Sequence, residues 1–188
     1  MDLFLSICIG VGLSAACGYR VFVPLLGMSI AASTGHISLP SGLEWISSNQ
    51  ALAAFSAATI LEIGGYYIPL IDNFIDTVAT PAAVIAGTIV MSSFITDVSP
   101  FLKWSLAIIA GGGTAGLFQG STTLIRSTST VTTAGMGNFA VTSLETGLSL
   151  VLTVLSFFLP FITALIVLVL IFIVLKIIFK RVFLKRYN

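Results

Sequence analysis

The sequence predicts an all-α, polytopic membrane protein with about six transmembrane helices. Of its 188 residues, 57% are hydrophobic and 8% are charged, with a mean hydropathy of +1.12, whereas soluble domains carry about 25% charged residues. Apolar runs of roughly 20 residues, enough to cross a bilayer as a helix, are separated by Gly, Pro, Asp and Ser. Residues 1–188 should therefore form a single integral membrane domain, with no room for a soluble catalytic domain.

The apolar runs place the helices in order. The first covers about 2–32 and is interrupted near residues 17–20 and at Pro24, because Gly and Pro break helices. A polar connection over 36–49 carries Trp45, a residue suited to the membrane interface. Five further helices are predicted at about 50–68, 81–96, 101–126, 141–158 and 161–179.

Three shorter segments separate these helices. An amphipathic stretch at 70–80 precedes the third helix, a hydroxyl-rich segment at 127–133 follows the fourth, and Pro160 marks a turn before the sixth. The fourth helix contains the run Gly111-Gly112-Gly113, which should interrupt it. The first and fourth helices are thus both expected to be broken.

Basic residues predict the orientation. Five of the eight Lys and Arg gather at the end of the last helix and in the tail over 181–188: Lys176, Lys180, Arg181, Lys185 and Arg186. The positive-inside rule places this end in the cytoplasm, which indicates a multi-pass protein of the cell inner membrane. Membrane lipid is an expected partner, and anionic lipid would also suit the basic cluster, although topology is the favoured explanation. A net charge of +1 offers nucleic acid no basic face.

An internal repeat is visible in the small residues. Two sets share the same four-residue spacing and an offset of 106 positions: Ser6, Gly10 and Ser14 before Arg20, and Gly112, Gly116 and Gly120 before Arg126. Small residues at every fourth position lie on one helical face and let another helix approach closely. These faces should serve helix packing, within the chain or in a homo-oligomer.

A second match extends the repeat. Residues 59–64 (TILEIG) agree with residues 142–147 (TSLETG) at Thr, Leu, Glu and Gly. The halves would be 1–96 and 97–180, and three helices in each half would make the repeat inverted. Inverted repeats with broken helices place binding sites near the midplane, where the halves meet.

Four charged residues fall within or at the ends of apolar segments: Arg20, Glu62, Arg126 and Glu145. An ionised group at a helix centre costs about 2.5–3.5 kcal/mol on insertion scales, so two neutral Arg–Glu pairs are expected, within each half or between halves. Three interpretations remain open: a proton-linked gate, structural clasps that hold broken helices, or arginines that reach the headgroups from helix ends.

Two further acidic residues, Asp72 and Asp76, are spaced i, i+4 and share one helical face. They are candidate ligands for a proton or cation, but an acidic interfacial face is favoured because a metal needs more oxygen ligands. Asn138 completes the candidate pathway, and the hydroxyls at 127–133 suit either a wetted path or an ordinary loop. The sequence has no catalytic constellation, metal-ligand spacing or cofactor motif, so we expect no enzyme, metal or cofactor.

The stretch 18–26 (GYRVFVPLL) resembles the opening signature of a small bacterial membrane-protein family catalogued as a domain of unknown function (four-one-two-six). Similar features follow at Leu61-Glu62, 68–72 (IPLID), 80–82 (TPA), Ala86-Gly87, Arg126, Asn138 and Leu144-Glu145, so the resemblance covers roughly residues 8–160. Where members carry an Asp-Lys pair before the Ile-Pro, this chain has Tyr66-Tyr67, which removes a charge partner for Glu62. The resemblance implies a multi-helix membrane fold and supplies no activity.

Two functions remain open from the sequence. The first is a small transporter or channel-like protein that moves an ion or small solute through the charged residues at the interface of the two halves. The second is a structural or assembly protein whose glycine-rich faces pack against a partner or a second copy.

Overall fold

The computed structural model describes residues 3–68, 71–96 and 98–184, and these residues form helices and connections without strands. The α-helices are α1 (Leu3–Tyr19), α2 (Phe22–Ser33), α3 (Asn49–Gly65), α4 (Asp72–Phe94), α5 (Pro100–Leu106), α6 (Gly113–Thr133), α7 (Asn138–Phe158) and α8 (Pro160–Leu184); η1 (Glu44–Ser47) is a 3₁₀ turn and η2 (Ala107–Gly112) a π-helical segment. Four described segments are long and apolar enough to cross a membrane: 74–94, 100–133, 138–158 and 160–177. The polytopic helical membrane fold is confirmed.

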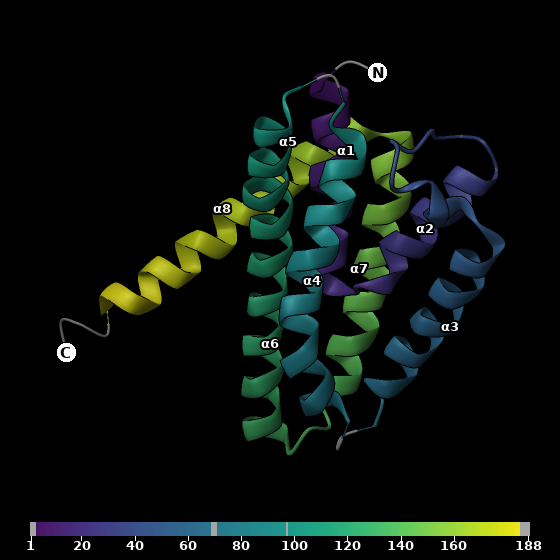
Figure 1. Ribbon diagram of the computed structural model, residues 1–188. Coiled ribbons are helices and arrows are strands. Elements are labelled where there is room, and N and C mark those ends of the chain that lie inside the picture. Colours follow the sequence, from purple (N-terminus) through teal and green to yellow (C-terminus); the bar gives the residue numbers. More distant parts are fainter. Residues whose placement is uncertain (1–2, 69–70, 97, 185–188) are drawn as a thin grey trace.

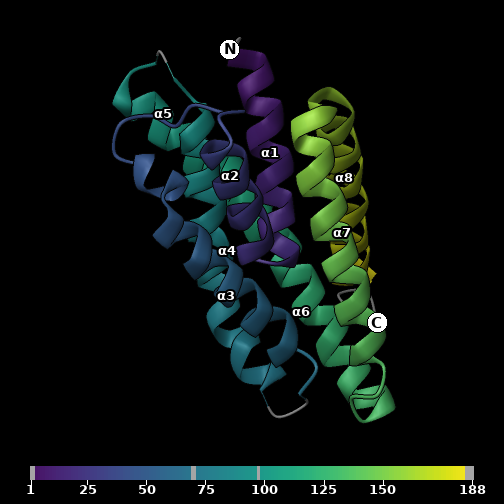
Figure 2. The ribbon, with the colours of Figure 1, turned by 90° about the vertical axis from the view of Figure 1, so that its right-hand side faces the viewer.

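The first predicted helix is broken at Arg20, and the chain reverses there (Figures 1 and 2). Contacts with α7 establish the reversal. Along α1, Gly12 lies beside Ser156 and the Ala16 carbonyl accepts a hydrogen bond from Ser149, so α1 runs antiparallel to α7. Gly27, further along the chain in α2, again lies beside the C-terminal half of α7. Helices α1 and α2 therefore form a hairpin that enters and leaves the bundle at the same end. The predicted break at Pro24 is absent, since this residue occupies the first turn of α2, where proline is tolerated.

The predicted break in the fourth helix is absent, because 100–133 is one continuous helical span in which Gly111 and Gly112 belong to the π-helical segment η2. Two predicted boundaries are also wrong. The amphipathic stretch at 70–80 and the helix at 81–96 form one continuous helix, α4, with Pro81 inside it. The segment 127–133, for which the sequence allowed an ordinary loop, is helical and forms the end of α6. Its Ser and Thr hydroxyls donate to carbonyls of the preceding turn, as Thr132 does to the Thr128 carbonyl at 2.9 Å, so they do not oppose the helix.

The centre of the bundle is held by small residues, so that α1, α4 and α6 approach closely. The Ser14 hydroxyl donates to the Gly87 carbonyl at 2.9 Å, and a Cβ on Gly111 would collide with the backbone oxygen of Gly87. Such close approach is how helices associate where lipid removes the hydrophobic drive between them.

The structure places the six predicted packing residues unequally. Ser6 and Ser14 are buried. Gly10 lies against Met91 of α4, and Gly112 and Gly116 lie against Val84 of the same helix. By contrast, Gly120 has open space where its side chain would be. The Gly and Ser faces of α1 and of the first half of α6 are therefore covered from within the chain, by α4.

The inverted repeat is not confirmed. Helix α1 runs antiparallel to α4, because Ser14 meets Gly87 and Gly10 meets Met91. The segment formed by η2 and α6 also runs antiparallel to α4, because Gly112 meets Thr88 and Gly116 meets Val84. These two helices, which carry the matching small residues, therefore run in the same direction. The helices with the matching Leu-Glu segments, α3 and α7, run in opposite directions (Figures 1 and 2). No single symmetry operation relates both matches.

The last helix, α8, begins beside the N-terminal end of α1. Its C-terminal end diverges from the bundle (Figure 1). Most of its large apolar side chains are exposed, including Leu168, Phe172 and Phe179, which suits a helix surrounded by lipid. It extends to Leu184, so the first four residues of the predicted basic tail are helical.

Candidate functional site

Five buried polar side chains meet where α1, α3, α4, α6 and α7 converge: Arg20, Tyr66, Asp76, Arg126 and Glu145, which we call the charge cluster. Arg20 has no exposed surface, and Arg126 and Glu145 are 3% and 2% exposed. Arg126 and Glu145 lie seven residues from Thr133 and Asn138, the ends of α6 and α7 that face each other. At 1.5 Å per residue, the cluster lies about 10 Å inside that end of the bundle.

Glu145 on α7 joins the two arginines. Its Oε2 atom lies 3.3 Å from Nη2 of Arg20 and also accepts a close hydrogen bond from Nη2 of Arg126. Asp76 on α4 provides a second carboxylate, 3.5 Å from Nη1 of Arg126. When all four groups are ionised, the two positive charges and two negative charges cancel. This balance is what allows guanidinium groups to remain inside an apolar bundle.

Tyr66 fills the space between the arginines. The guanidinium carbons of Arg20 and Arg126 lie 4.1 and 4.0 Å from the centroid of its ring, within the range of a cation–π interaction. Its hydroxyl donates to Oδ1 of Asp76 at 3.1 Å. The ring thus keeps two like charges apart while its hydroxyl orients one of their counter-ions.

The guanidinium of Arg20 is fixed by α7. Its Nε donates to the hydroxyl of Thr146 and its Nη2 to the carbonyl of Thr142, both at 3.1 Å. The Thr142 carbonyl also accepts a hydrogen bond from the Thr146 hydroxyl, at 2.8 Å. Arg20 therefore connects the point at which α1 ends to the helix that carries Glu145.

Glu62 has a different role from the other carboxylates. Its Oε1 and Oε2 accept hydrogen bonds from the backbone N–H groups of Val21 and Phe22, at 2.7 and 3.0 Å. These are N–H groups at the start of α2, which have no partner within that helix. A carboxylate also complements the partial positive charge of a helix N-terminus. Glu62, on α3, thus caps α2 from outside and fixes the tip of the hairpin.

Several buried atoms of the charge cluster and of the adjoining Thr142 have no hydrogen-bond partner within the described chain. They are Nη1 of Arg20, Nε and Nη1 of Arg126, Oε1 of Glu145 and Oγ1 of Thr142. An unsatisfied buried polar group costs about 1–3 kcal/mol, so such a concentration in one place is unusual. The atoms supply mostly N–H donors, which suits an acceptor such as water, a carbonyl or an anion.

The other predicted site residues are placed as follows. Asn138 lies at the start of α7, and its amide donates to the hydroxyl of Thr130 at 3.0 Å, one turn beyond Arg126 on α6. Asp76 is buried and points into the cluster, so it does not lie on an exposed acidic face. The side chain of Asp72 lies outside the described part of the structure. Among the described residues, no group of three or more His, Cys, Asp or Glu could hold a metal ion.

The predicted pairing of two arginines with two glutamates is replaced by a shared arrangement. Glu145 serves both arginines, Asp76 serves Arg126, and Glu62 binds backbone. Sequence reasoning missed Tyr66, Thr142 and Thr146. The two threonines flank Glu145 on its helix, which is a usable signal, whereas nothing local to Tyr66 indicates that two distant arginines would stack on it.

The chain matches one family model, described as Domain of unknown function (DUF4126), over residues 7–180. This range covers most of the chain, so the chain belongs to that family. No curated protein matches it, and no solved structure matches it. The family description carries no activity, and the geometry of the charge cluster is the basis for a functional proposal.

Proposed function

We propose that this member of the family is a small membrane transporter, and that the charge cluster binds the transported solute. The observation that carries the proposal is the set of unpartnered guanidinium N–H groups on Arg20 and Arg126, both of which are almost completely buried. Ionisable groups inside membrane helices are rare and usually belong to substrate or ion pathways. If the charge cluster had only a structural role, its buried N–H donors would be expected to have hydrogen-bond acceptors.

The free atoms favour an anionic solute over a metal cation. Three guanidinium nitrogens lack a hydrogen-bond acceptor, although Nη1 of Arg126 is ion-paired with Asp76 at 3.5 Å, against one carboxylate oxygen, Oε1 of Glu145. Two arginines would also repel a cation. Because the ionised cluster is neutral, an anion alone would leave an uncompensated charge in a medium of low dielectric constant. A proton taken up by Glu145 along with the anion would keep the site neutral. The proposed cargo is therefore a small monovalent anion together with a proton.

The proposed transport cycle includes a movement of the hairpin formed by α1 and α2. Arg20 is fully buried, so a solute has no direct access to it in the arrangement described here. The tip of the hairpin is fixed from two sides. Glu62 on α3 accepts from the N–H groups of Val21 and Phe22, and the side chains of Glu145 and Thr146 on α7 bind Arg20. Release of either contact would let the tip move relative to α7 and open a path to the cluster.

The test is anion-driven proton movement in vesicles that contain the purified protein and a pH-sensitive dye. An inward gradient of nitrate or chloride, anions without a dissociable proton, should acidify the lumen faster than in protein-free vesicles. Arg126→Gln should abolish the acidification. Glu145→Gln, which resembles the protonated acid, should still pass the anion, detected as a change in membrane potential, but without acidification. Glu62→Gln should change the rate of uptake.

The matched control is Lys176→Gln, which removes an exposed charge from α8, outside the cluster. It should leave the flux unchanged. If the wild type moves none of the anions tested, or if Arg126→Gln and Glu145→Gln both transport at the wild-type rate in folded form, the cluster is not a transport site.

The alternative, an assembly protein that packs through its glycine-rich faces, is less well supported. Those faces would have to be available to a partner, whereas Gly10 and Gly112 are covered by α4 of the same chain. The exposed glycines, such as Gly113 and Gly147, do not form a stripe with the four-residue spacing of a packing face.

A further inference from the structure

A row of buried polar side chains leads from the charge cluster to the end of the bundle at which α6 and α7 are joined. On α7, Thr142 lies three residues before Glu145, and Asn138 lies four residues before Thr142, so all three share one face of the helix. Their exposed fractions are 2% for Glu145, 0% for Thr142 and 5% for Asn138. The row extends over about 10 Å at 1.5 Å per residue, which is the distance from the cluster to the start of α7.

The hydroxyl of Thr142 differs from the other buried hydroxyls of α7. Those of Ser149, Thr153 and Ser156 all donate to backbone carbonyls, as Ser and Thr in helices commonly do. By contrast, Oγ1 of Thr142 has no hydrogen-bond partner among the described residues, and neither has Oε1 of Glu145. Side chains three residues apart on a helix are neighbours, so rotation of the Thr142 side chain brings its hydroxyl within reach of the carboxylate.

The outer end of the row is polar on both helices. The amide of Asn138 donates to the hydroxyl of Thr130 at 3.0 Å, and this hydroxyl donates to the Arg126 carbonyl at 3.0 Å. Thr130 is half-buried, whereas Arg126, one turn further into the bundle, is buried. Polar side chains that face the interior of a membrane bundle commonly mark ion pathways and proton relays. The row therefore links the buried carboxylate to a partly exposed polar end.

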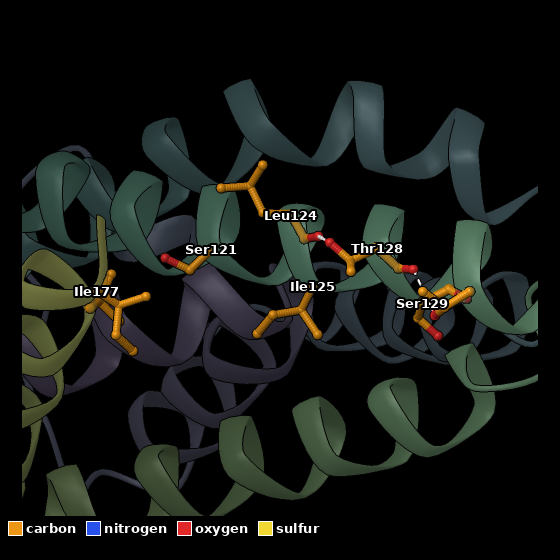
Figure 3. A pocket seen from close by; sticks show the side chains of 8 residues that line it. Ser121, Leu124, Ile125, Thr128, Ser129 and Ile177 are labelled. Carbon is orange, nitrogen blue, oxygen red and sulfur yellow. Dashed lines mark hydrogen bonds between the residues drawn. The ribbon is translucent and has the colours of Figure 1, made fainter. Parts of the chain in front are cut away.

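The hydroxyls on the opposite face of α6 have no such connection. Ser121, Thr128, Ser129 and Thr132 line a groove of about 490 Å³ between α6 and α8, away from the charge cluster (Figure 3). Thr128 donates to the Leu124 carbonyl at 2.8 Å, as the dashed line in Figure 3 shows. Among the described residues that line this groove, none carries a carboxylate. These side chains therefore serve as a control for hydroxyl groups that lead to no proton acceptor.

We propose that Thr142 relays protons between the solution and Oε1 of Glu145, and that Asn138 and Thr130 form the polar entrance to this route. The inference rests on the proposed function, in which Glu145 takes up a proton. In the relay, the Thr142 hydroxyl passes its hydrogen to Oε1 while its oxygen receives a proton from the solution side, so the threonine is left unchanged. The route does not require the hairpin to move, so protonation of Glu145 can precede access of the anion.

The charges around Glu145 are kept constant in the test. Ionisable side chains from four other parts of the bundle surround this carboxylate: Tyr19 and Arg20 of α1, Glu62 of α3 with the adjoining Tyr66, Asp76 of α4 and Arg126 of α6. The variants that probe the route change none of these groups. A change in the rate of protonation then reflects the route and not the electrostatic environment of the carboxylate.

The test follows the protonation of Glu145 by infrared spectroscopy of the purified full chain. A light pulse releases protons from a photoacid in the solution, and the band of the protonated carboxyl, identified by its loss in Glu145→Gln, is recorded over time. A positioned proton-transfer group typically contributes about 100-fold or more to a rate. Thr142→Val, which keeps the shape of the side chain and removes the hydroxyl, should therefore slow the band by about tenfold or more. Thr142→Ser, which keeps the hydroxyl, should restore the rate.

A second variant and a matched control complete the test. Asn138→Leu makes the entrance apolar without changing the charge cluster and should also slow the band, whereas Thr128→Val, on the opposite face of α6, should leave the rate unchanged. A wild-type rate in folded Thr142→Val would overturn the route and leave the proposed function standing. If Thr142→Val does not fold, the rate in Asn138→Leu decides in the same way. If acidified wild-type protein shows no Glu145 band, both the route and the proposed proton uptake are wrong.

Discussion

Helices α1 and α8 are both strongly apolar, yet they occupy opposite environments. Eleven residues of α1 are buried, and nine of these are Gly, Ala, Ser or Cys. In α8, which is longer and rich in Ile, Leu, Val and Phe, Thr163 and Val167 are the buried positions among the side chains described. Hydropathy alone does not separate a central membrane helix from a peripheral one. Side-chain size does, because small residues let backbones meet.

The difference also explains where the charges lie. Arg20 follows the small-residue face of α1, and Arg126 follows the small-residue face of α6. Close packing of these helices against α4 brings their ends to one place. The long side chains of α8 would hold neighbouring helices too far apart for one carboxylate to reach two guanidinium groups. The predictions below test this contrast between a close-packed interior and a lipid-facing periphery.

The largest effect is expected from Glu145→Ala, which removes the carboxylate shared by both arginines. Two guanidinium groups would remain buried with Asp76 as their nearest charge partner, and breaking a buried ion pair from one side costs about 3–5 kcal/mol. Unfolding monitored by circular dichroism in detergent should show this loss. The matched change Glu44→Ala, at an exposed carboxylate, should have little effect. A Glu145→Ala protein as stable as wild type would mean that the cluster is hydrated from outside.

The next effect concerns the seam between α4 and α6. Gly111→Val would place a side chain against the Gly87 carbonyl, where a backbone atom cannot move aside. We expect a loss of about 2–3 kcal/mol, in the upper range for overpacking, with release of α6 from α4. Gly113→Ala, two residues on, faces open space and should be neutral or slightly stabilising. Equal stabilities of the two variants would show that the seam is not closely packed.

Much of the interior could be predicted from residue type and spacing, and the parts that could not depend on contacts between distant segments. The break at Arg20 follows from Gly18 and the polar residues around it. The reversal of the chain there does not, because the reversal depends on Glu62, which lies forty residues further on and supplies acceptors for the first N–H groups of α2.

The continuity of α4 through Pro81 has a similar explanation. A proline removes one backbone donor and usually interrupts a helix, but Ala79, Ala83 and Ala86 pack this helix into the core on both sides of the proline. Tertiary burial outweighs the local preference. In the same way, the repeat in the sequence is real as a pattern of small residues, while the direction in which each copy runs is set by its neighbours and is invisible in the spacing.

A moderate effect is expected from Glu62→Gln at the tip of the hairpin. An amide keeps one acceptor for Val21 or Phe22 but turns its NH₂ group towards the other N–H, and it removes the charge at the start of α2. The loss should be about 1–2 kcal/mol. Hydrogen exchange should accelerate at Val21 and Phe22 and remain unchanged at the centre of α7. Uniform acceleration throughout the bundle would instead show that Glu62 supports the whole fold.

The smallest effect is expected from Leu175→Ala on α8, whose side chain is 40% exposed. In a bilayer or detergent its partner is alkyl chain rather than protein, and an alanine leaves no cavity because a neighbouring lipid fills the space. Surface changes of this kind usually alter stability by about 0.5 kcal/mol or less, against about 2–5 kcal/mol for the same truncation in a closed core. A loss in the core range, measured by the same unfolding experiment, would mean that α8 packs against protein, and a second copy of the chain would then be the partner to seek.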